Sequence, residues 1–299
     1  MKTATSKAES GETRRFDAYQ AVTDTILKKL EEGTVPWRCP WDRKVGRPRN
    51  FASNREYQGI NVMLLGVKRF ASPYWLTMRQ ANDLGGQVRK GERGTLIVKY
   101  GRHERRTKGK EEEETKAVYY LRGYTVFNAL QIDGVEFPEM ELPEPQANEG
   151  RIESAERIVQ EMPGKPDIHE GRTVRACYRV STDTIEMPAR SRFIDAESYH
   201  LVLFHEIIHS TGHERRLNRN SLMGATGAVM TEYSKEELVA EMGSAFLGME
   251  AGIVQDEHEQ SAAYLQCWLD TLREPNRKRW IVEAASLAAK AANHVLAIE

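Results

Sequence analysis

Two histidines four residues apart, within an apolar stretch, constrain this chain more than any other feature. His205 and His209 stand in the pattern His-Glu-x-x-His, and Glu206 directly follows the first histidine. In an α-helix both histidines lie on one face, about one turn apart, so they can bind the same divalent metal. The pattern is typical of zinc hydrolases, in which the intervening glutamate is the general base. We therefore expect a metal site built on one buried helix.

The neighbouring residues favour such a helix. Asp195 is suited to the N-cap position, and Ile194 is placed to pack against Tyr199 as a hydrophobic staple. Residues 201–208 are mostly apolar and provide the buried body of the helix. Gly212 is suited to end it, because glycine commonly follows the last helical turn.

A catalytic zinc site needs a third protein ligand and one open position. Glu237 and Glu241, one turn apart in the pattern Glu-x-x-Ala-Glu, are the carboxylate candidates. In zincins with a glutamate ligand the first Glu of this pattern binds the metal, which favours Glu237 and leaves Glu241 to orient a ligand histidine. If Ser234 and Glu237 form a capping box instead, Glu241 becomes the ligand.

Two further residues near the motif are candidates for the same site. His213 is a possible ligand, although Gly212 is expected to take it off the helical face. His213 and Tyr233 are also candidates to stabilise the oxyanion of peptide hydrolysis, because both are near the ligands in sequence.

The alternative to a metal site is a buried helix with satisfied polar residues. Two histidines and two glutamates within about forty residues make that interpretation the weaker one.

The cysteines and apolar runs indicate a cytoplasmic protein without a membrane partner. Cys39, Cys177 and Cys267 are scattered and lack Cys-x-x-Cys spacing, which favours reduced thiols. Residues 1–15 are polar and lack the apolar core of a signal peptide. No apolar run has the length that a bilayer-spanning helix needs.

The distribution of charge divides the chain into two expected domains. Residues 35–110 hold 18 basic and 5 acidic residues, although the net charge of the whole chain is -1. Such a surplus is typical of a surface that binds a polyanion. Residues 139–150 are acidic, contain proline and hold few apolar side chains, which indicates a linker. We expect domains at 1–140 and 151–299, joined by a linker at 141–150.

The basic half is expected to be an α+β domain that binds single-stranded DNA. An amphipathic helix is predicted at 16–32, and strands at 96–100 and 118–127 are predicted to flank a mobile charged loop at 105–114. Aromatic rings among basic residues suit a single strand, because rings stack on bases and cations neutralise phosphates. Any one of these aromatic residues can instead belong to the core. The expected DNA-binding residues are Trp37, Arg38, Trp41, Arg43, Lys44, Arg47, Arg49, Arg55, Tyr57, Trp75, Arg79, Arg89, Lys90 and Arg93.

The second half is expected to be mostly helical. A helix is predicted at 151–162 and strands at 174–180 and 184–187, ahead of the helix that carries the histidine motif. We expect the helix with Glu237 and Glu241 to follow, and then further helices after residue 258.

Motifs along nearly the whole chain point to one family. The segments are Pro36-Trp37, Pro40-Trp41, 57–61, 75–80, 85–91, 183–188, 205–213 and 237–241. Together they resemble the ArdC-type antirestriction proteins carried by conjugative plasmids. The resemblance implies an N-terminal single-stranded-DNA-binding domain, a C-terminal zincin-like metallopeptidase domain and protection of incoming plasmid DNA from host restriction. The expected cofactor is one zinc ion, with manganese or another divalent metal as the alternative.

Three functions remain open at this point. The first is a DNA-binding metallopeptidase, with Glu206 as general base, that cleaves a restriction enzyme or another DNA-bound protein. The second is a non-enzymatic protein that coats single-stranded DNA and holds a structural metal. The third, a metal-dependent nuclease, is disfavoured, because two histidines and one carboxylate suit zinc better than magnesium.

Overall fold

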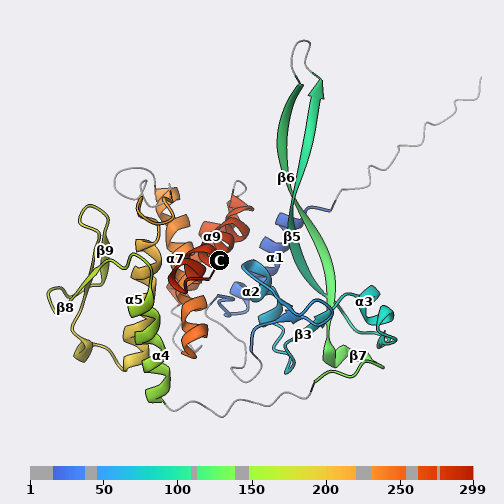
Figure 1. Ribbon diagram of the computed structural model, residues 1–299, viewed down its shortest axis with the longest axis horizontal. Helices are drawn as coiled ribbons and strands as arrows, with labels where there is room; N and C mark the ends of the chain where they lie inside the picture. Colours follow the sequence, from blue (N-terminus) through green and yellow to red (C-terminus); the bar gives the residue numbers. More distant parts are fainter. Residues whose placement is uncertain are drawn as a thin grey trace, which may run out of the picture.

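A computed structural model of the chain describes residues 16–37, 46–108, 113–138, 148–219, 230–253, 262–274 and 277–298. In Figure 1 the sheet-bearing N-terminal half lies on the right and the helical C-terminal half on the left. The α+β class expected from the sequence is confirmed. Among the helices of the described ranges, none combines the length and apolar character that crossing a membrane requires.

A five-stranded sheet forms the frame of the N-terminal half. Its strand order is β2 (Arg55–Glu56), β1 (Arg49–Asn50), β3 (Tyr74–Leu76), β6 (Glu113–Asn128) and β5 (Thr95–Lys108). The whole of β5 pairs antiparallel with residues 113–126 of β6, and in Figure 1 their hairpin projects beyond the rest of the molecule.

This hairpin corrects the loop that we expected at 105–114. β5 continues to Lys108 and β6 begins at Glu113, so only residues 109–112 lie outside the described strands. The strand ladder depends on backbone N–H and C=O groups, so a run of charged side chains does not prevent it. Charge composition alone was therefore a poor guide to where these strands end.

In the described part of the N-terminal half, three helices accompany this sheet. α1 (Ala18–Glu31) begins at Asp17, whose carboxylate accepts hydrogen bonds from two backbone N–H groups of the first turn. α3 (Met78–Asp83) begins with a capping box. α2 (Ile60–Gly66) follows the loop after β2. A small two-stranded sheet pairs β4 (Gln87–Val88) with β7 (Ile132–Asp133).

The C-terminal half begins with α4 (Asn148–Glu161), three residues earlier than the helix we expected at 151–162. A three-stranded sheet follows, with the order β8 (Asp167–Glu170), β10 (Thr184–Met187) and β9 (Cys177–Arg179). β9 and β10 correspond to the two predicted strands, whereas β8 was not predicted. Among the residues that the structure describes, four helices complete the half: α5 (Ala196–Ser210), α7 (Met230–Ala251), α8 (Ala262–Arg273) and α9 (Trp280–Val295).

The two halves share one apolar core. α1 packs on α8 and α9, and the apolar cluster that contains Val22 and Ile26 continues into the C-terminal helices. Within this core Trp37 contacts Trp268 edge to face, with ring centroids 5.5 Å apart. α9 also contacts α2 and α7, so this helix touches elements of both halves.

Candidate metal centre

The α5 helix carries the histidine motif. Asp195 is its N-cap and accepts a hydrogen bond from the backbone N–H of Ser198 at 2.7 Å, as the sequence predicted. The expected staple by Ile194 is wrong, because that side chain is 89% exposed. Phe193 packs edge to face on Tyr199 instead, with centroids 5.2 Å apart, because the larger ring fills the space over the first turn.

Close packing against α7 fixes the position of α5. Leu203, Phe204, Ile207 and Ile208 on α5 are all buried. Opposite them, α7 has a glycine, Gly243, where a Cβ atom would come within 2.7 Å of the Ile208 side chain. The absence of a side chain there lets the two helices approach, and this approach brings the ligand residues of both helices together.

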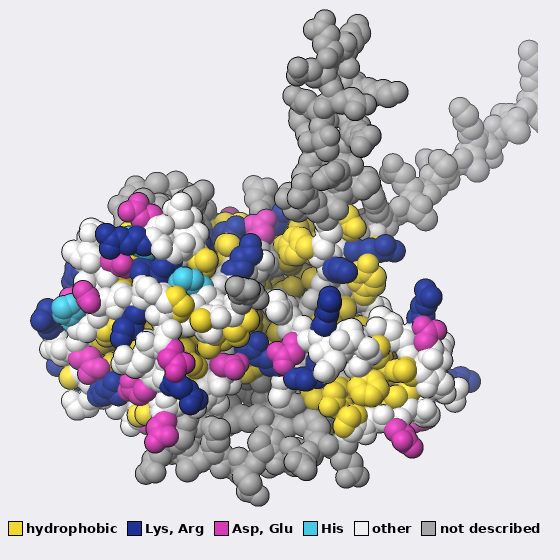
Figure 2. Space-filling view, in the orientation of Figure 1, with side chains coloured by type: hydrophobic (Ala, Val, Ile, Leu, Met, Phe, Trp, Pro, Cys, Tyr) yellow, Lys and Arg dark blue, Asp and Glu magenta, His cyan; other side chains and the backbone are white. Residues whose placement is uncertain are grey.

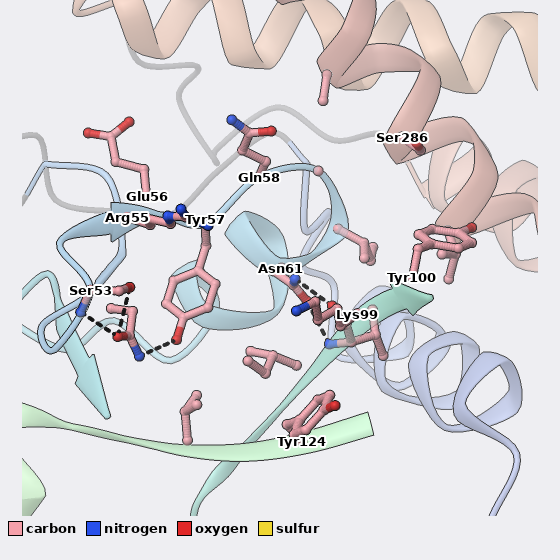
Figure 3. A pocket seen from close by; sticks show the side chains of 18 of the residues that line it. Ser53, Arg55, Glu56, Tyr57, Gln58, Asn61, Lys99, Tyr100, Tyr124 and Ser286 are labelled. Carbon is pink, nitrogen blue, oxygen red and sulfur yellow. Dashed lines mark hydrogen bonds between the residues drawn. The ribbon is translucent and has the colours of Figure 1, made fainter. Parts of the chain in front are cut away.

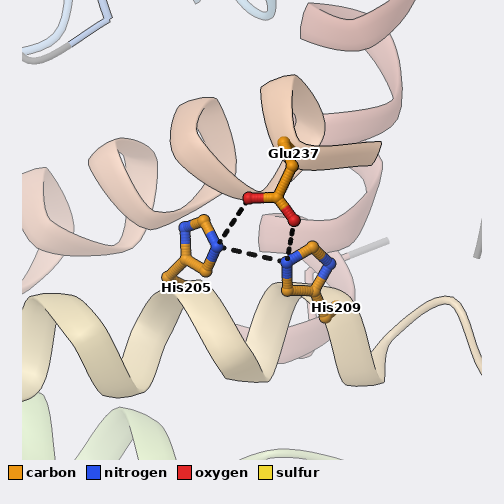
Figure 4. A group of neighbouring side chains, drawn as sticks. All are labelled: His205, His209 and Glu237. Atoms are coloured by element: carbon orange, nitrogen blue, oxygen red, sulfur yellow. Dashed lines mark hydrogen bonds and ion pairs between the residues drawn. The ribbon is translucent and has the colours of Figure 1, made fainter. Parts of the chain in front are cut away.

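The three residues His205, His209 and Glu237 converge on one point, as Figure 4 shows. The Nε2 atoms of the two histidines lie 3.1 Å apart. The Glu237 carboxylate oxygens lie 3.5 Å from His205 Nε2 and 3.4 Å from His209 Nε2. Ligand atoms at about 2.0–2.1 Å from a tetrahedral zinc ion lie about 3.3–3.4 Å from one another. The donor set therefore fits a divalent cation in chemistry and in spacing.

The other candidate ligands lie outside this group. Glu241 and His213 do not belong to the converging set. The Nδ1 atom of His213 accepts a hydrogen bond from the backbone N–H of Arg215 at 3.2 Å, and Gly212 follows the end of α5 as expected. The side chain of Tyr233 lies outside the part of the chain that the structure describes.

Glu236, which no motif in the sequence indicated, contacts His209. Its carboxylate lies 3.4 Å from His209 Nδ1, whereas Glu237 contacts Nε2 of the same ring. The guanidinium of Arg219 contacts both Glu236 oxygens and donates a 2.8 Å hydrogen bond to the backbone carbonyl of Ile208. The sequence favoured Glu241 as the carboxylate that orients a ligand histidine. In the structure, the carboxylate next to Nδ1 of His209 is that of Glu236. The only sequence signal was an acidic residue directly before Glu237.

These contacts hold the site in a strongly charged state. Burial lowers the pKa of His209, but hydrogen bonds to Glu236 and Glu237 outweigh burial and raise it to about 10. Burial raises the pKa of Glu236, yet the bonds from His209 and Arg219 lower it to about 2. The pKa of Glu237 is also far below its usual range, despite burial, because both histidines bond to it. A cation at this point replaces the histidine protons, since histidine ligates metal in its neutral form.

Glu206 is buried and follows His205 on α5. The negative charge of Glu206 helps to raise the pKa of His209, so the two side chains interact electrostatically. A buried carboxylate beside a metal site is suited to general base catalysis.

Two of the residues expected to bind DNA are buried tryptophans. Trp37 and Trp75 are 0% and 2% exposed, so neither ring is open to a base, and this corrects their assignment as stacking residues. Both belong to apolar cores. The residues Arg38, Trp41, Arg43 and Lys44 lie outside the described part of the chain.

Several of the expected phosphate contacts are engaged within the protein. Arg47 pairs with Glu250 at 2.8 Å, and Arg49 pairs with Glu56 at 2.7 Å. Arg89 pairs with two carboxylates, and Arg79 lies 3.6 Å from Asp83. On the face shown in Figure 2, Lys and Arg side chains alternate with Asp and Glu over both halves. The remaining residues of the predicted set that the structure describes are the exposed Arg55, Lys90 and Arg93 and the half-buried Tyr57.

Two known protein families match separate segments of this chain. Residues 16–127 match the profile of the N-terminal domain of anti-restriction factor ArdC. Residues 153–287 match the profile of a zincin-like metallopeptidase. Both the metal ligands and Glu206 fall within the second match.

Similar proteins cover nearly the whole chain. An uncharacterized protein y4eC of Sinorhizobium fredii is 36% identical over 290 residues, which cover 93% of this chain and 91% of the relative. A DNA primase TraC of Escherichia coli is 36% identical over 304 residues, but the match spans 27% of that longer protein.

Two crystal structures of the antirestriction protein ArdC from plasmid R388 are also similar. The metal-free structure has 38% sequence identity and a TM-score of 0.72, with 95% of this chain and 100% of ArdC covered. The Mn(II)-bound structure has 38% identity and a TM-score of 0.71, with 94% and 98% covered.

Proposed function

This chain belongs to the ArdC family of antirestriction proteins, and from that premise we propose that it binds single-stranded DNA and hydrolyses peptide bonds at a divalent metal centre. In this proposal it protects plasmid DNA that enters a restricting cell. Its protein substrate is one that it meets on DNA in the cytoplasm, such as a restriction enzyme.

The convergence of His205, His209 and Glu237 carries the peptidase part of the proposal. These residues would hold the metal, and zinc suits two imidazoles and one carboxylate. Manganese is the alternative, because it is the metal bound in the ArdC structure from R388. When bound, the ion supplies Lewis acidity, which acidifies water and polarises the scissile carbonyl.

The protein side chains then have separate tasks. Glu206 accepts a proton from the attacking water and delivers it to the leaving amine. Glu236 accepts a hydrogen bond from Nδ1 of His209, and this bond keeps Nε2 of the ring directed at the metal site. Hydrogen bonds from His205 and His209 keep the Glu237 carboxylate ionised, although burial acts in the opposite direction.

The DNA-binding part rests on different observations. The ArdC N-terminal profile covers residues 16–127, and residues 35–110 carry the basic surplus. The TraC relatives are named as DNA primases, so sequence of this kind occurs within a protein that acts on DNA.

Transfer of unmodified plasmid DNA into a restricting host tests whether hydrolysis is part of the function. Glu206→Gln removes the base but retains the metal ligands, so we expect metal content to be unchanged and peptide hydrolysis to fall by roughly 10²–10⁴-fold. If hydrolysis is required, the wild type restores transfer and this variant, at matched expression, does not.

Equal protection by the wild type and Glu206→Gln would favour the second candidate, a DNA-coating protein with a structural metal. Protection by neither would contradict the antirestriction role. If only the wild type protects the DNA, mass spectrometry of the recipient cells identifies the substrate as the host protein that the wild type degrades and Glu206→Gln does not.

A further inference from the structure

A cavity of about 740 Å³ lies away from the metal ligands, where the N-terminal sheet meets α9. Its walls come from the loop between β2 and α2, from β5 and β6, and from one side of α9 (Figure 3). Sites for small organic molecules have volumes of about 300–1,000 Å³, so one nucleotide with its sugar and phosphate fits within the cavity. The metal centre does not use this space, and two of its lining residues, Arg55 and Tyr57, belong to the predicted DNA-binding set.

Three tyrosines line the cavity. Tyr57 projects into it from the loop before α2, and its hydroxyl oxygen accepts a 3.4 Å hydrogen bond from the Asn50 side chain (Figure 3). Tyr124 lies on β6, and the guanidinium of Arg122 lies 5.4 Å from the centre of its ring. Tyr100 lies beside α9. Burial raises the pKa of Tyr57 and of Tyr100, so these rings remain neutral near an anion.

The charged side chains around the cavity favour an anionic ligand. Arg55, Lys99 and Lys290 come from β2, β5 and α9, are exposed, and have no ion-pair partner among the described residues. Glu56 is the one carboxylate in the described lining, and Arg49 pairs with it at 2.7 Å. The cavity therefore combines unpaired cations with aromatic rings.

The loop from Tyr57 to Asn61 is built to hold these walls together. Gly59 has φ of 57°, and a Cβ atom there would lie 3.4 Å from the Ala285 carbonyl oxygen on α9. The Asn61 side chain donates to the Val98 carbonyl and accepts from the Val98 N–H, both at 2.8 Å. This segment thus joins the α9 wall of the cavity to the β5 wall. It gives a structural role to the 57–61 motif, which takes no part in the metal centre.

We propose that this cavity binds one nucleotide unit of single-stranded DNA, with the base against the Tyr57 and Tyr124 rings and the phosphate near Arg55, Lys99 and Lys290. The inference rests on the proposed DNA binding and deepens it. Lys290 and Asn293 lie beyond both family-profile matches, which end at residues 127 and 287. The DNA site therefore spans both halves of the chain and is incomplete without α9.

Binding of a fluorescent oligothymidylate strand to the full chain tests this inference. Tyr124→Ala removes a stacking ring and is expected to weaken binding roughly tenfold, whereas Tyr124→Phe keeps the ring and the affinity. Lys290→Glu is expected to weaken binding severalfold at low salt, with a smaller deficit at high salt. Lys165→Glu makes the same charge change on an exposed residue outside the cavity and serves as the matched control.

Photocrosslinking of a bromodeoxyuridine-substituted strand gives a second, independent readout. Crosslinks at Tyr57, Tyr100 or Tyr124 support the assignment. Crosslinks confined to other regions, together with wild-type affinity in Tyr124→Ala and Lys290→Glu, would overturn it while leaving DNA binding itself intact. Wild-type protein that does not bind the strand at all would overturn both this inference and the proposed function.

Competition with free thymidine monophosphate separates two sources of the same chemistry. A strand binds through several phosphates, so the mononucleotide is expected to compete only at far higher concentration than the unlabelled strand. Equal competition by the two would assign the cavity to a free nucleotide and would contradict the single-strand assignment.

Discussion

The carboxylate of Glu236 lies between a buried arginine and a ligand histidine, and this position sets which nitrogen of His209 faces the metal site. Glu236 is 1% exposed, and Arg219 is the cation that balances it. A carboxylate on the outer nitrogen of a ligand histidine fixes the ring and makes it a better ligand. The geometry of the metal centre thus depends on two residues that do not belong to the converging ligand set.

Replacement of Glu236 tests this dependence. Glu236→Gln is expected to weaken zinc affinity by about 10–100-fold, measured by competition with a fluorescent chelator. The same change leaves Arg219 buried without a counter-charge, so the free energy of unfolding should fall by about 3–5 kcal/mol.

A paired variant separates the two effects. Arg219→Met combined with Glu236→Gln removes both buried charges, so stability should recover while zinc affinity stays low. Full zinc affinity in Glu236→Gln would contradict the orienting role.

At the scale of elements, the contact between α5 and α7 brings the histidines to Glu237. This contact is close because Gly243 has no side chain where Ile208 packs. Neither the helix period nor the histidine motif predicts this glycine, since it depends on the partner helix.

Gly243→Ala is expected to force the two helices apart. The added methyl group would lie within 2.9 Å of three Ile208 side-chain carbons, so the free energy of unfolding should fall by about 1–3 kcal/mol. Zinc affinity should fall as well, because the ligands lie on separate helices. Chemical denaturation and chelator competition measure the two effects.

Ile208→Ala provides the matched background for this test. Its smaller side chain leaves room for the new methyl group, so Gly243→Ala should cost less there than in the wild type. Equal costs in both backgrounds would contradict the packing explanation.

The whole molecule is held by a core that runs from α1 into α8 and α9. Trp37 and Trp268 belong to it, and the indole N–H of Trp37 is buried without a hydrogen-bond partner among the described residues. The two halves that charge and composition distinguish are therefore packed against each other.

Trp37→Ala tests whether this residue is structural. Loss of the buried ring should lower the free energy of unfolding by about 3–5 kcal/mol, whereas Trp37→Phe should cost less because it keeps an aromatic ring. The affinity of the folded variants for single-stranded DNA should not change. A stable Trp37→Ala protein with weak DNA binding would restore the stacking role that the sequence suggested.

Local signals predicted the parts of this molecule that depend on local structure. Residues close together in sequence predicted three features correctly. These are the shared helix face of His205 and His209, the N-cap at Asp195 and the α+β class. The burial of Trp37 and Trp75 and the contact of Glu236 with His209 depend on residues far away in the chain. Aromatic residues among cations look the same in sequence whether they pack in a core or face a ligand.

Metal analysis of the purified chain and its variants tests the central claim most directly. Inductively coupled plasma mass spectrometry should find one bound divalent ion per chain in the wild type, Glu206→Gln and Glu241→Gln. Glu237→Gln and His209→Ala should lose it, because each removes a converging ligand atom. Retention of the ion in Glu237→Gln, with loss in Glu241→Gln, would contradict the metal centre described above.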